Sequence, residues 1–176
     1  MAVAFRAVGA RTKAVGGGTR TVAMPAGVLA GDALLLVSET DNRLDETMVS
    51  AGWTKLLVAG RHDQQSFLLW PKINFFWKVA SGAEGANQSV SYSTLSYPTG
   101  TPNIVAFIIA WSGTHATSPF IDFDGTSTTS ASATVDHPII TVSSANSWLL
   151  TVRGFSSNGG VTFTCSVGGS VRLVHS

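Results

Sequence analysis

Apolar and polar residues alternate along much of this chain with a period of two, the pattern of a strand with one buried and one wetted face. Segments 73–80 and 161–167 alternate in this way. Segments 34–37, 104–111 and 148–152 are instead apolar at nearly every position. Such runs are typical of central strands that are covered on both faces.

Turn residues separate the predicted strands. The sequence Ser-Asn-Gly-Gly at 157–160 predicts a tight hairpin and a second turn is expected at 167–170, so the C-terminal region should form a meander. No segment sustains a helical period, and 41–50 is compatible with a single helical turn at most. About ten short strands are expected, near residues 2–8, 20–24, 33–40, 53–59, 73–80, 89–93, 104–111, 138–143, 147–155, 161–167 and 171–175.

These elements predict an all-β protein, an antiparallel β-sandwich that is jelly-roll-like. The chain has 176 residues, which fits one domain, and no linker or repeat interrupts it. We therefore expect residues 1–176 to form a single β-sandwich domain.

Low charge is the unusual feature of the composition. Charged residues make up 12% of the chain, hydrophobic residues make up 44%, and the formal net charge is +1. This balance is the reverse of that in a disordered chain. No basic cluster occurs, so no nucleic-acid partner is expected. Hydroxyl groups from 21 serines and 19 threonines replace much of the missing charge, and a weakly charged surface also suits burial against partners.

The remaining charge is unevenly distributed. Segment 39–46 is rich in charged residues, whereas segment 85–121 contains no Asp, Glu, Lys or Arg. We expect a contact surface to draw on this uncharged stretch. The candidate interface residues are Trp70, beside a proline in a predicted connection, and Tyr92, Tyr97, His115 and Phe120.

No membrane or secretion signal is evident in the sequence. The longest apolar run, 104–111, has eight residues, too few to cross a bilayer. The first six residues lack the charged start and long apolar core of a signal peptide. One cysteine, Cys165, allows no internal disulfide, so synthesis in a reducing cytoplasm is expected.

Candidate catalytic and metal-binding residues are few. Cys165 lies on the apolar side of its predicted strand without a neighbouring base, which favours a buried structural thiol. The four histidines, His62, His115, His137 and His175, lack the close spacing of a local zinc motif. Asp122 and Asp124 could supply two oxygen ligands to calcium, but no bidentate glutamate follows them.

Enzymatic motifs are also missing. The nucleophile pattern Gly-x-Ser-x-Gly does not occur, and the glycines at 16–18 precede no Lys-Ser or Lys-Thr, so they predict a flexible turn rather than a phosphate loop. We expect no enzyme, no cofactor and no metal. Three of the five tryptophans, Trp77, Trp111 and Trp148, lie in strongly apolar strands and should pack in the core.

Several short phrases occur in a characteristic order and resemble a β-sandwich domain common in virion proteins of tailed bacteriophages, often described as head-decoration or minor tail proteins. The resemblance covers about residues 20–155, and each phrase alone is degenerate. The phrases are MPAG at 24–27, GDALL at 31–35, AGWTKL at 51–56, FWKVA at 76–80, VSY at 90–92, AWSG at 110–113, SPFID at 118–122, ITVS at 140–143 and ANSWLL at 145–150.

The resemblance implies a non-catalytic structural component of a phage particle. The small size of the chain and its single expected domain favour a capsid decoration (minor capsid) protein over a minor tail protein. Implied partners are other virion subunits, such as the major capsid or tail proteins, and further copies of the chain in a trimer or another small ring. The expected location is the virion, after synthesis in the host cytoplasm. Members of the group usually continue through further strands after the region that corresponds to 161–173. This chain is therefore either a shorter version or part of a longer one, and a strand edge is expected to lie open near its end.

Two other functions remain open at this stage. A carbohydrate-binding module that recognises host glycans would need at least two coplanar exposed aromatic side chains with Asp or Asn nearby. An enzyme acting on polysaccharide would need two carboxylates facing each other across a cleft. Burial of the tryptophans would count against the carbohydrate-binding module.

Overall fold

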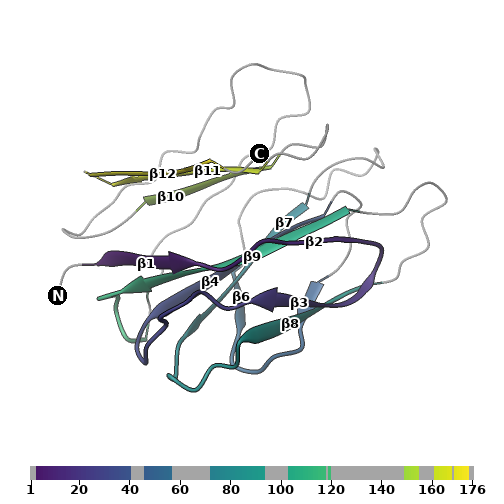
Figure 1. Ribbon diagram of the computed structural model, residues 1–176, viewed down its shortest axis with the longest axis horizontal. Coiled ribbons are helices and arrows are strands. Elements are labelled where there is room, and N and C mark those ends of the chain that lie inside the picture. Colours follow the sequence, from purple (N-terminus) through teal and green to yellow (C-terminus); the bar gives the residue numbers. More distant parts are fainter. Residues whose placement is uncertain are drawn as a thin grey trace, which may run out of the picture.

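The computed structural model of the chain describes residues 3–40, 46–56, 72–93, 103–117 and 119, and it describes three C-terminal strands by their backbone alone (Figure 1). Twelve strands form in these ranges, and all their ladders are antiparallel. They are β1 (Ala4–Val8), β2 (Thr12–Val15), β3 (Gly18–Ala23), β4 (Ala33–Thr40), β5 (Glu46–Met48), β6 (Thr54–Leu56), β7 (Lys72–Val79), β8 (Asn87–Tyr92), β9 (Asn103–Ser112), β10 (Leu149–Gly154), β11 (Val161–Val167) and β12 (Gly169–Val174).

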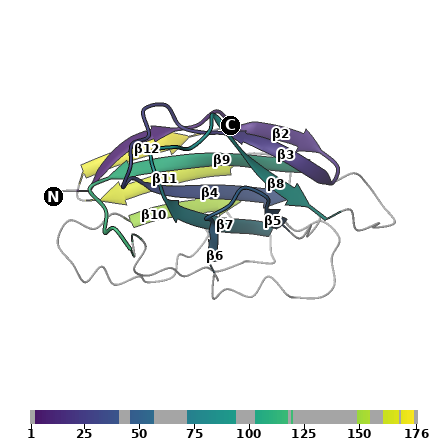
Figure 2. The same cartoon turned by 90° about the horizontal axis from the view of Figure 1, so that it is seen from below.

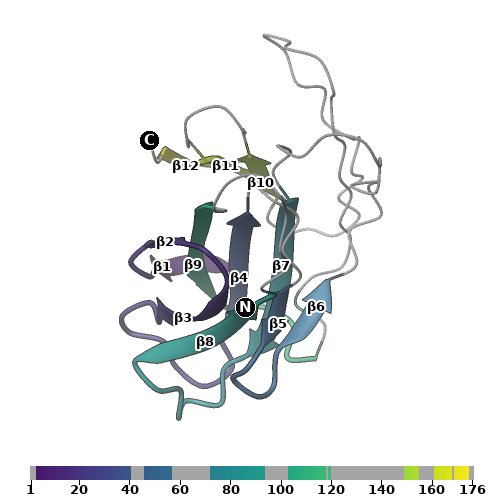
Figure 3. The ribbon, with the colours of Figure 1, turned by 90° about the vertical axis from the view of Figure 1, so that its right-hand side faces the viewer.

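Nine of these strands form two sheets that pack as a sandwich. The larger sheet has the order β1–β9–β4–β7–β6, with β2 also paired to β9, and the smaller has the order β3–β8–β5. Figure 2 shows β9, β4 and β7 of the larger sheet running side by side, and Figure 3 shows β3 and β8 along one side of it. The prediction of an all-β antiparallel sandwich is confirmed.

Strand pairing is nested, which is the connectivity of a jelly roll. The first strands, β1 and β2, pair with the last sandwich strand β9, then β3 pairs with β8, and β4 pairs with β7. Consecutive strands also alternate between the two sheets from β3 to β5 and from β7 to β9. The chain therefore resembles one long hairpin that has been folded over itself.

The main core lies between the two sheets. Its fully buried members include Leu34 and Leu36 of β4, Val90 of β8 and Ile108 of β9, each with no exposed area. In β4 these residues alternate with a second set, because successive side chains point to opposite faces of a sheet.

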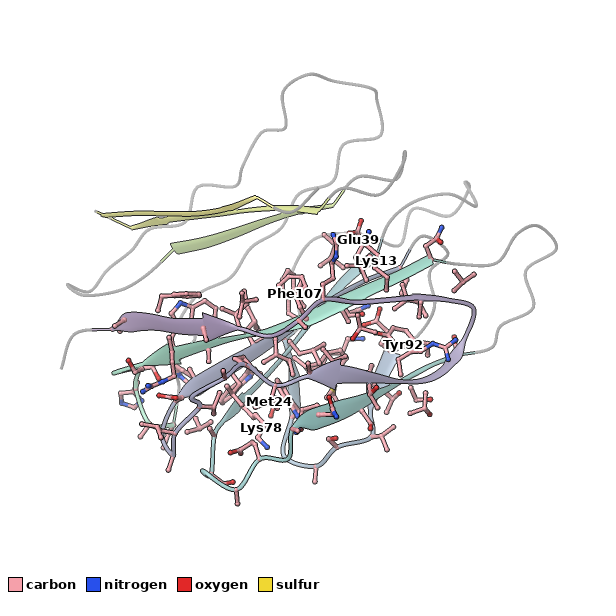
Figure 4. All side chains as sticks on the ribbon, viewed as in Figure 1. Lys13, Met24, Glu39, Lys78, Tyr92 and Phe107 are labelled. Carbon is pink, nitrogen blue, oxygen red and sulfur yellow. The ribbon has the colours of Figure 1, made fainter. Side chains whose placement is uncertain are left out.

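The second set lies on the outer face of the larger sheet. It includes Leu35, Val37, Phe107, Ile109 and Trp111, which are 1–5% exposed. Figure 4 shows Phe107 on the opposite side of this sheet from Met24 and Tyr92. The apolar runs 34–37 and 104–111 are thus explained by burial on both faces of β4 and β9.

A third sheet has the order β10–β11–β12. Figures 1 and 3 show it on the side of the larger sheet opposite to β3 and β8. None of the described ladders joins it to the sandwich. Its pairing confirms the predicted C-terminal meander.

Most predicted strands coincide with observed ones, and two strands were not expected. These are β2 and β5, which have four and three residues and polar sequences. The single helical turn considered for 41–50 is not observed where the structure describes that segment, since Glu46–Met48 is a strand. The strand predicted near 138–143 lies outside the described residues.

Candidate functional site

Tyr92 belongs to the core and not to a contact surface. It is 1% exposed, and its Oη lies 2.8 Å from Oγ of Ser38 on the facing sheet. The expectation that Tyr92 meets a partner is therefore corrected. The physical reason is the alternation along β8, where Gln88, Val90 and Tyr92 are the residues that point inward.

The other candidate interface residues fall into two groups. His115 is exposed just after β9, and its Nδ1 lies 3.4 Å from the amide nitrogen of Thr117. Its exposure keeps it a candidate for a surface contact. Trp70, Tyr97 and Phe120 lie outside the residues that the structure describes.

One end of the inner core is polar. We call Ser38, Thr40, Glu46, Asn74 and Tyr92 the inner polar cluster, and all five are at most 6% exposed. Ser38 and Thr40 continue the inward row of Leu34 and Leu36 along β4, and Ser38 is paired in register with Asn74 of β7. Glu46 of β5 is paired with Tyr92 of β8.

The charges around this cluster act on Tyr92. Burial raises the pKa of the Tyr92 hydroxyl well above its ordinary value, the hydrogen bond with Ser38 opposes this, and the negative charge of Glu46 adds to the increase. Tyr92 therefore stays protonated and serves as a hydrogen-bonding group. The buried carboxylate also has a structural role at an edge strand, since an inward charge discourages β5 from pairing with another chain.

Asp32 anchors the start of β4. Its carboxylate is buried, forms an ion pair with Arg6 of β1, accepts a hydrogen bond from Nη2 of Arg6 at 2.9 Å and accepts another from the amide of Leu29 at 2.8 Å. The contact joins β1 to the turn before β4. It satisfies this carboxylate within the chain, which is the usual condition for burying one.

Glu84 organises the β7–β8 turn in a similar way. Oε1 accepts hydrogen bonds from the amide of Ser81 at 2.7 Å and from its hydroxyl at 3.0 Å, and Oε2 accepts one from the amide of Gly82 at 2.9 Å. Burial alone would raise the pKa of Glu84, but these hydrogen bonds outweigh it and lower the pKa to about 2. Nζ of Lys78 lies 3.3 Å from Oε1.

Lys78 also meets Trp53. Its ammonium lies 5.8 Å from the centre of the indole ring, within the range of a cation–π contact, and Nε1 of Trp53 donates a hydrogen bond to Oε1 of Gln88 at 2.9 Å. Trp53 is partly buried and packs against the main core. These contacts brace the β5–β6 connection against β7 and β8.

The described tryptophans are packing residues. Trp111 is 5% exposed, Trp77 packs against the second set on the outer face of the larger sheet, and Trp53 packs against the main core. Core packing is thus confirmed for Trp111, whereas Trp77, also expected in the core, is only partly buried and packs against that set. Trp148, like Trp70, lies outside the described residues, so its predicted burial stays a prediction.

The other chemical candidates mostly lie outside the described part of the chain. This applies to Asp122, Asp124 and the three histidines other than His115. Cys165 is described by backbone only, opposite Leu150 and Val171 in the register. Within the described ranges, no group of three or more His, Cys, Asp or Glu is placed to hold a metal ion, and no helix is long and apolar enough to cross a membrane.

The uncharged stretch 85–121 has a structural explanation in its described part. It contains β8 and β9, and β9 is largely buried within the larger sheet, with neighbours on both sides in β1 and β4. Charges would be costly at these inward positions. Among the described residues of the stretch, the exposed ones lie around 85–87, at Asn103 where β9 begins, and at 115–117.

Comparison with known proteins identifies no relative: no family model, no curated protein and no solved structure matches this chain. A functional proposal therefore depends on the geometry above and on the resemblance of the ordered phrases.

Proposed function

We propose that the protein is a non-catalytic structural component of a tailed-phage particle, a capsid decoration protein or else a minor tail protein, that binds neighbouring virion subunits. One observation carries the proposal: the phrases behind the resemblance contain the residues that brace the sandwich. Asp32, Trp53, Lys78, Tyr92 and Trp111 each come from a different phrase, and each makes a core or bracing contact.

This coincidence supports a shared architecture for a physical reason. Residues that tie a turn to a strand, or one sheet to the other, must keep both their type and their order along the chain. The jelly-roll connectivity adds support, because this architecture is used widely in viral capsids. Fold alone does not establish function, so the proposal needs a direct test.

The strand edges indicate how copies could associate. β5 and β6 have three residues each, β1 is interrupted by a register shift between Phe5 and Ala7, and the hydroxyl of Thr12 bonds to the carbonyl of Thr21 along β3. Short strands, bulges and covered edges all discourage pairing with another chain. The edges of the sandwich are thus protected.

The C-terminal sheet differs from the sandwich in this respect. β10 and β12 have six residues each, and their ladders with β11 run without a register shift. No described ladder covers the outer side of either strand. We therefore place the contact between copies of the chain at the β12 edge, where a second β12 could add in antiparallel fashion.

The decisive experiment uses phage particles produced with and without this chain. We expect the tagged protein to co-sediment with wild-type particles, and electron microscopy to show density on the head or tail that disappears when the gene is deleted. A protein that is monomeric and absent from particles would contradict the proposal.

A carbohydrate-binding module remains the competing function, because jelly rolls also occur in lectins. Its requirement for exposed coplanar aromatics finds no support in Trp53, Trp77 or Trp111, which pack against the cores. Specific binding on a glycan array, together with absence from particles, would favour it over the structural role.

A further inference from the structure

In the inner polar cluster, Oγ1 of Thr40 and Nδ2 of Asn74 are buried and have no hydrogen-bond partner among the described residues. Thr40 is 0% exposed and Asn74 is 6% exposed. Nearly all buried polar groups in folded proteins are hydrogen-bonded to protein or to ordered water, so each exception needs a physical explanation.

The register places these two atoms near each other. Ser38 lies directly opposite Asn74 on the paired strands β4 and β7, and Thr40 is two residues further along the same face of β4. Diagonal neighbours of this kind have their Cβ atoms roughly 7 Å apart. One bridging water spans polar atoms that are about 5.5 Å apart, twice an ordinary hydrogen-bond length.

A third side chain of the inner polar cluster, Glu46, can accept a hydrogen bond. The Glu46 carboxylate is 5% exposed, and Glu46 is paired in register with Tyr92, whose hydroxyl reaches Ser38, so both groups lie at this end of the core. A carboxylate has about four acceptor positions and can accept from a water molecule besides its other contacts. Buried waters typically make about three hydrogen bonds.

We propose that the inner polar cluster is an internal water-binding site, in which a water molecule joins Thr40 and Asn74 and donates towards Glu46. Its function is to satisfy the polar end of the core, so that the two sheets stay locked where the apolar packing of Leu34 and Leu36 ends. The site is independent of the proposed role in a virion.

Nuclear magnetic resonance can detect this water directly in the intact chain. We expect long-lived water cross-peaks to the Thr40 or Asn74 amides in the wild type, and their loss in Thr40→Val, which replaces the hydroxyl with a methyl group of similar shape. Absence of such cross-peaks from the wild type would overturn the proposal.

Thermal stability gives a second test with opposite signs for the two explanations. If the hydroxyl binds water, Thr40→Val should lower the Tm by about 2–4 °C, the shift expected for one lost buried hydrogen bond in a domain of this size. If the hydroxyl is merely unsatisfied, the variant should keep or raise the Tm, and the proposal fails. Thr47→Val on the exposed face of β5 is the matched control and should change the Tm little.

Coupling between the two side chains distinguishes a shared water from two separate contacts. In an Asn74→Leu background, Thr40→Val should produce almost no further decrease in Tm, because the water has already lost one of its anchors. Additive decreases in Tm would show that the residues do not share a ligand, and would overturn the bridging geometry.

Discussion

At the scale of single residues, Gly9 shows how closely the two sheets approach each other. A Cβ atom at this position would lie 2.2 Å from the carbonyl oxygen of Ala23, a backbone atom that cannot move aside easily. Gly9 follows β1 and its amide donates a hydrogen bond to the carbonyl of Ile108. The side chain must therefore be absent for the chain to pass between β9 and β3.

Replacing Gly9 by alanine should destabilise the protein by at least about 2 kcal/mol, within the range of overpacked cores. For a domain of this size the Tm should fall by about 4–8 °C in calorimetry. Gly85→Ala is the control, because a Cβ there meets only the Asn87 carbonyl at 3.8 Å. Equal effects of the two substitutions would contradict this role of Gly9.

Glu84 provides a second prediction at this scale, on pH dependence. Its pKa is about 2 in the folded protein, against an ordinary value of 4.5, so the folded state favours the charged form. The stabilisation from its ionised form should be complete above pH 4.5 and lost as the pH falls towards 2. Glu84→Gln should lower stability at neutral pH and lose its difference from wild type at the acid end of this range, as measured by denaturant unfolding.

Ser81→Ala serves as the comparison for Glu84. It removes the hydroxyl donor to Oε1 but leaves the amide donors of Ser81 and Gly82. The folded-state pKa of Glu84 should then move back towards 4.5, so the acid-induced loss of stability should be smaller and should end at a higher pH than in the wild type. An unchanged pH profile in both variants would show that Glu84 does not contribute in this way.

At the scale of elements, the corner between β2 and β3 carries the chain from the larger sheet to the smaller one. Gly16 and Gly18 have positive φ angles of 79° and 103°, which are accessible to glycine at little cost. Nη2 of Arg20 donates hydrogen bonds to the carbonyls of Val15, Gly16 and Gly17 at 2.9–3.1 Å. One side chain therefore holds a turn that would otherwise be flexible.

Replacing Arg20 by methionine should loosen this corner without unfolding the sandwich. Hydrogen bonds to charged groups contribute about 1.5–3 kcal/mol, and partial exposure places the expected loss at the lower end. Hydrogen exchange should accelerate at the amides of β2 and β3 and stay slow in β4 and β9. Lys13→Met removes an exposed charge from β2, next to the same corner, and should leave exchange unchanged. Uniform acceleration of exchange across all strands would contradict a role of Arg20 that is confined to the β2–β3 corner.

At the scale of the whole molecule, the expected contact between copies is the β12 edge. In an antiparallel ladder, adjacent residues alternately direct their N–H groups towards and away from a given neighbour. Ser170 and Val171 are adjacent in β12, so the N–H of one points towards β11 and the N–H of the other points away from it. Proline at the second of these positions should remove the N–H that points away from β11 and leave the β11–β12 ladder intact, so both Ser170→Pro and Val171→Pro are tested. That variant should stay folded by circular dichroism and become monomeric in light scattering. A wild type that is monomeric, or two folded variants that both still associate, would contradict edge pairing.

Local patterns were sufficient for much of the architecture. The strands β4 and β9 are predictable because apolar residues occupy both of their faces, and β7 is predictable because apolar residues recur at every second position. Burial of apolar residues dominates the energetics of folding. Turn glycines also mark boundaries correctly, as at Gly27 and Gly52, which adopt positive φ angles. The strands β2 and β5 escape detection because they are short and polar, and they exist only where β9 and β8 offer partners.

Within the candidate site, the sequence identifies residue types but not their surroundings. Period two divides Gln88, Ser89, Val90, Ser91 and Tyr92 into two faces, but it cannot say which face is covered. The sequence alone therefore leaves Tyr92 as a candidate for a surface contact, although this residue points into the core. The partners of Asp32 and Tyr92, Arg6 and Ser38, lie 26 and 54 residues away, beyond the reach of any local motif.

By itself, then, the sequence determined the all-β class, the antiparallel sandwich, the meander near the C-terminus and the scarcity of charge, because alternation and turn chemistry act between neighbours in the chain. Only the tertiary structure decided the nested pairing, in which Ala4 of β1 is paired with Ser112 of β9, 108 residues away in the chain. It also revealed that the uncharged stretch contains β8, which is buried on one face, and the largely buried β9, and it assembled the inner polar cluster from four strands. These features depend on which strand edges and faces meet, and that choice minimises the free energy of the whole chain rather than of any segment.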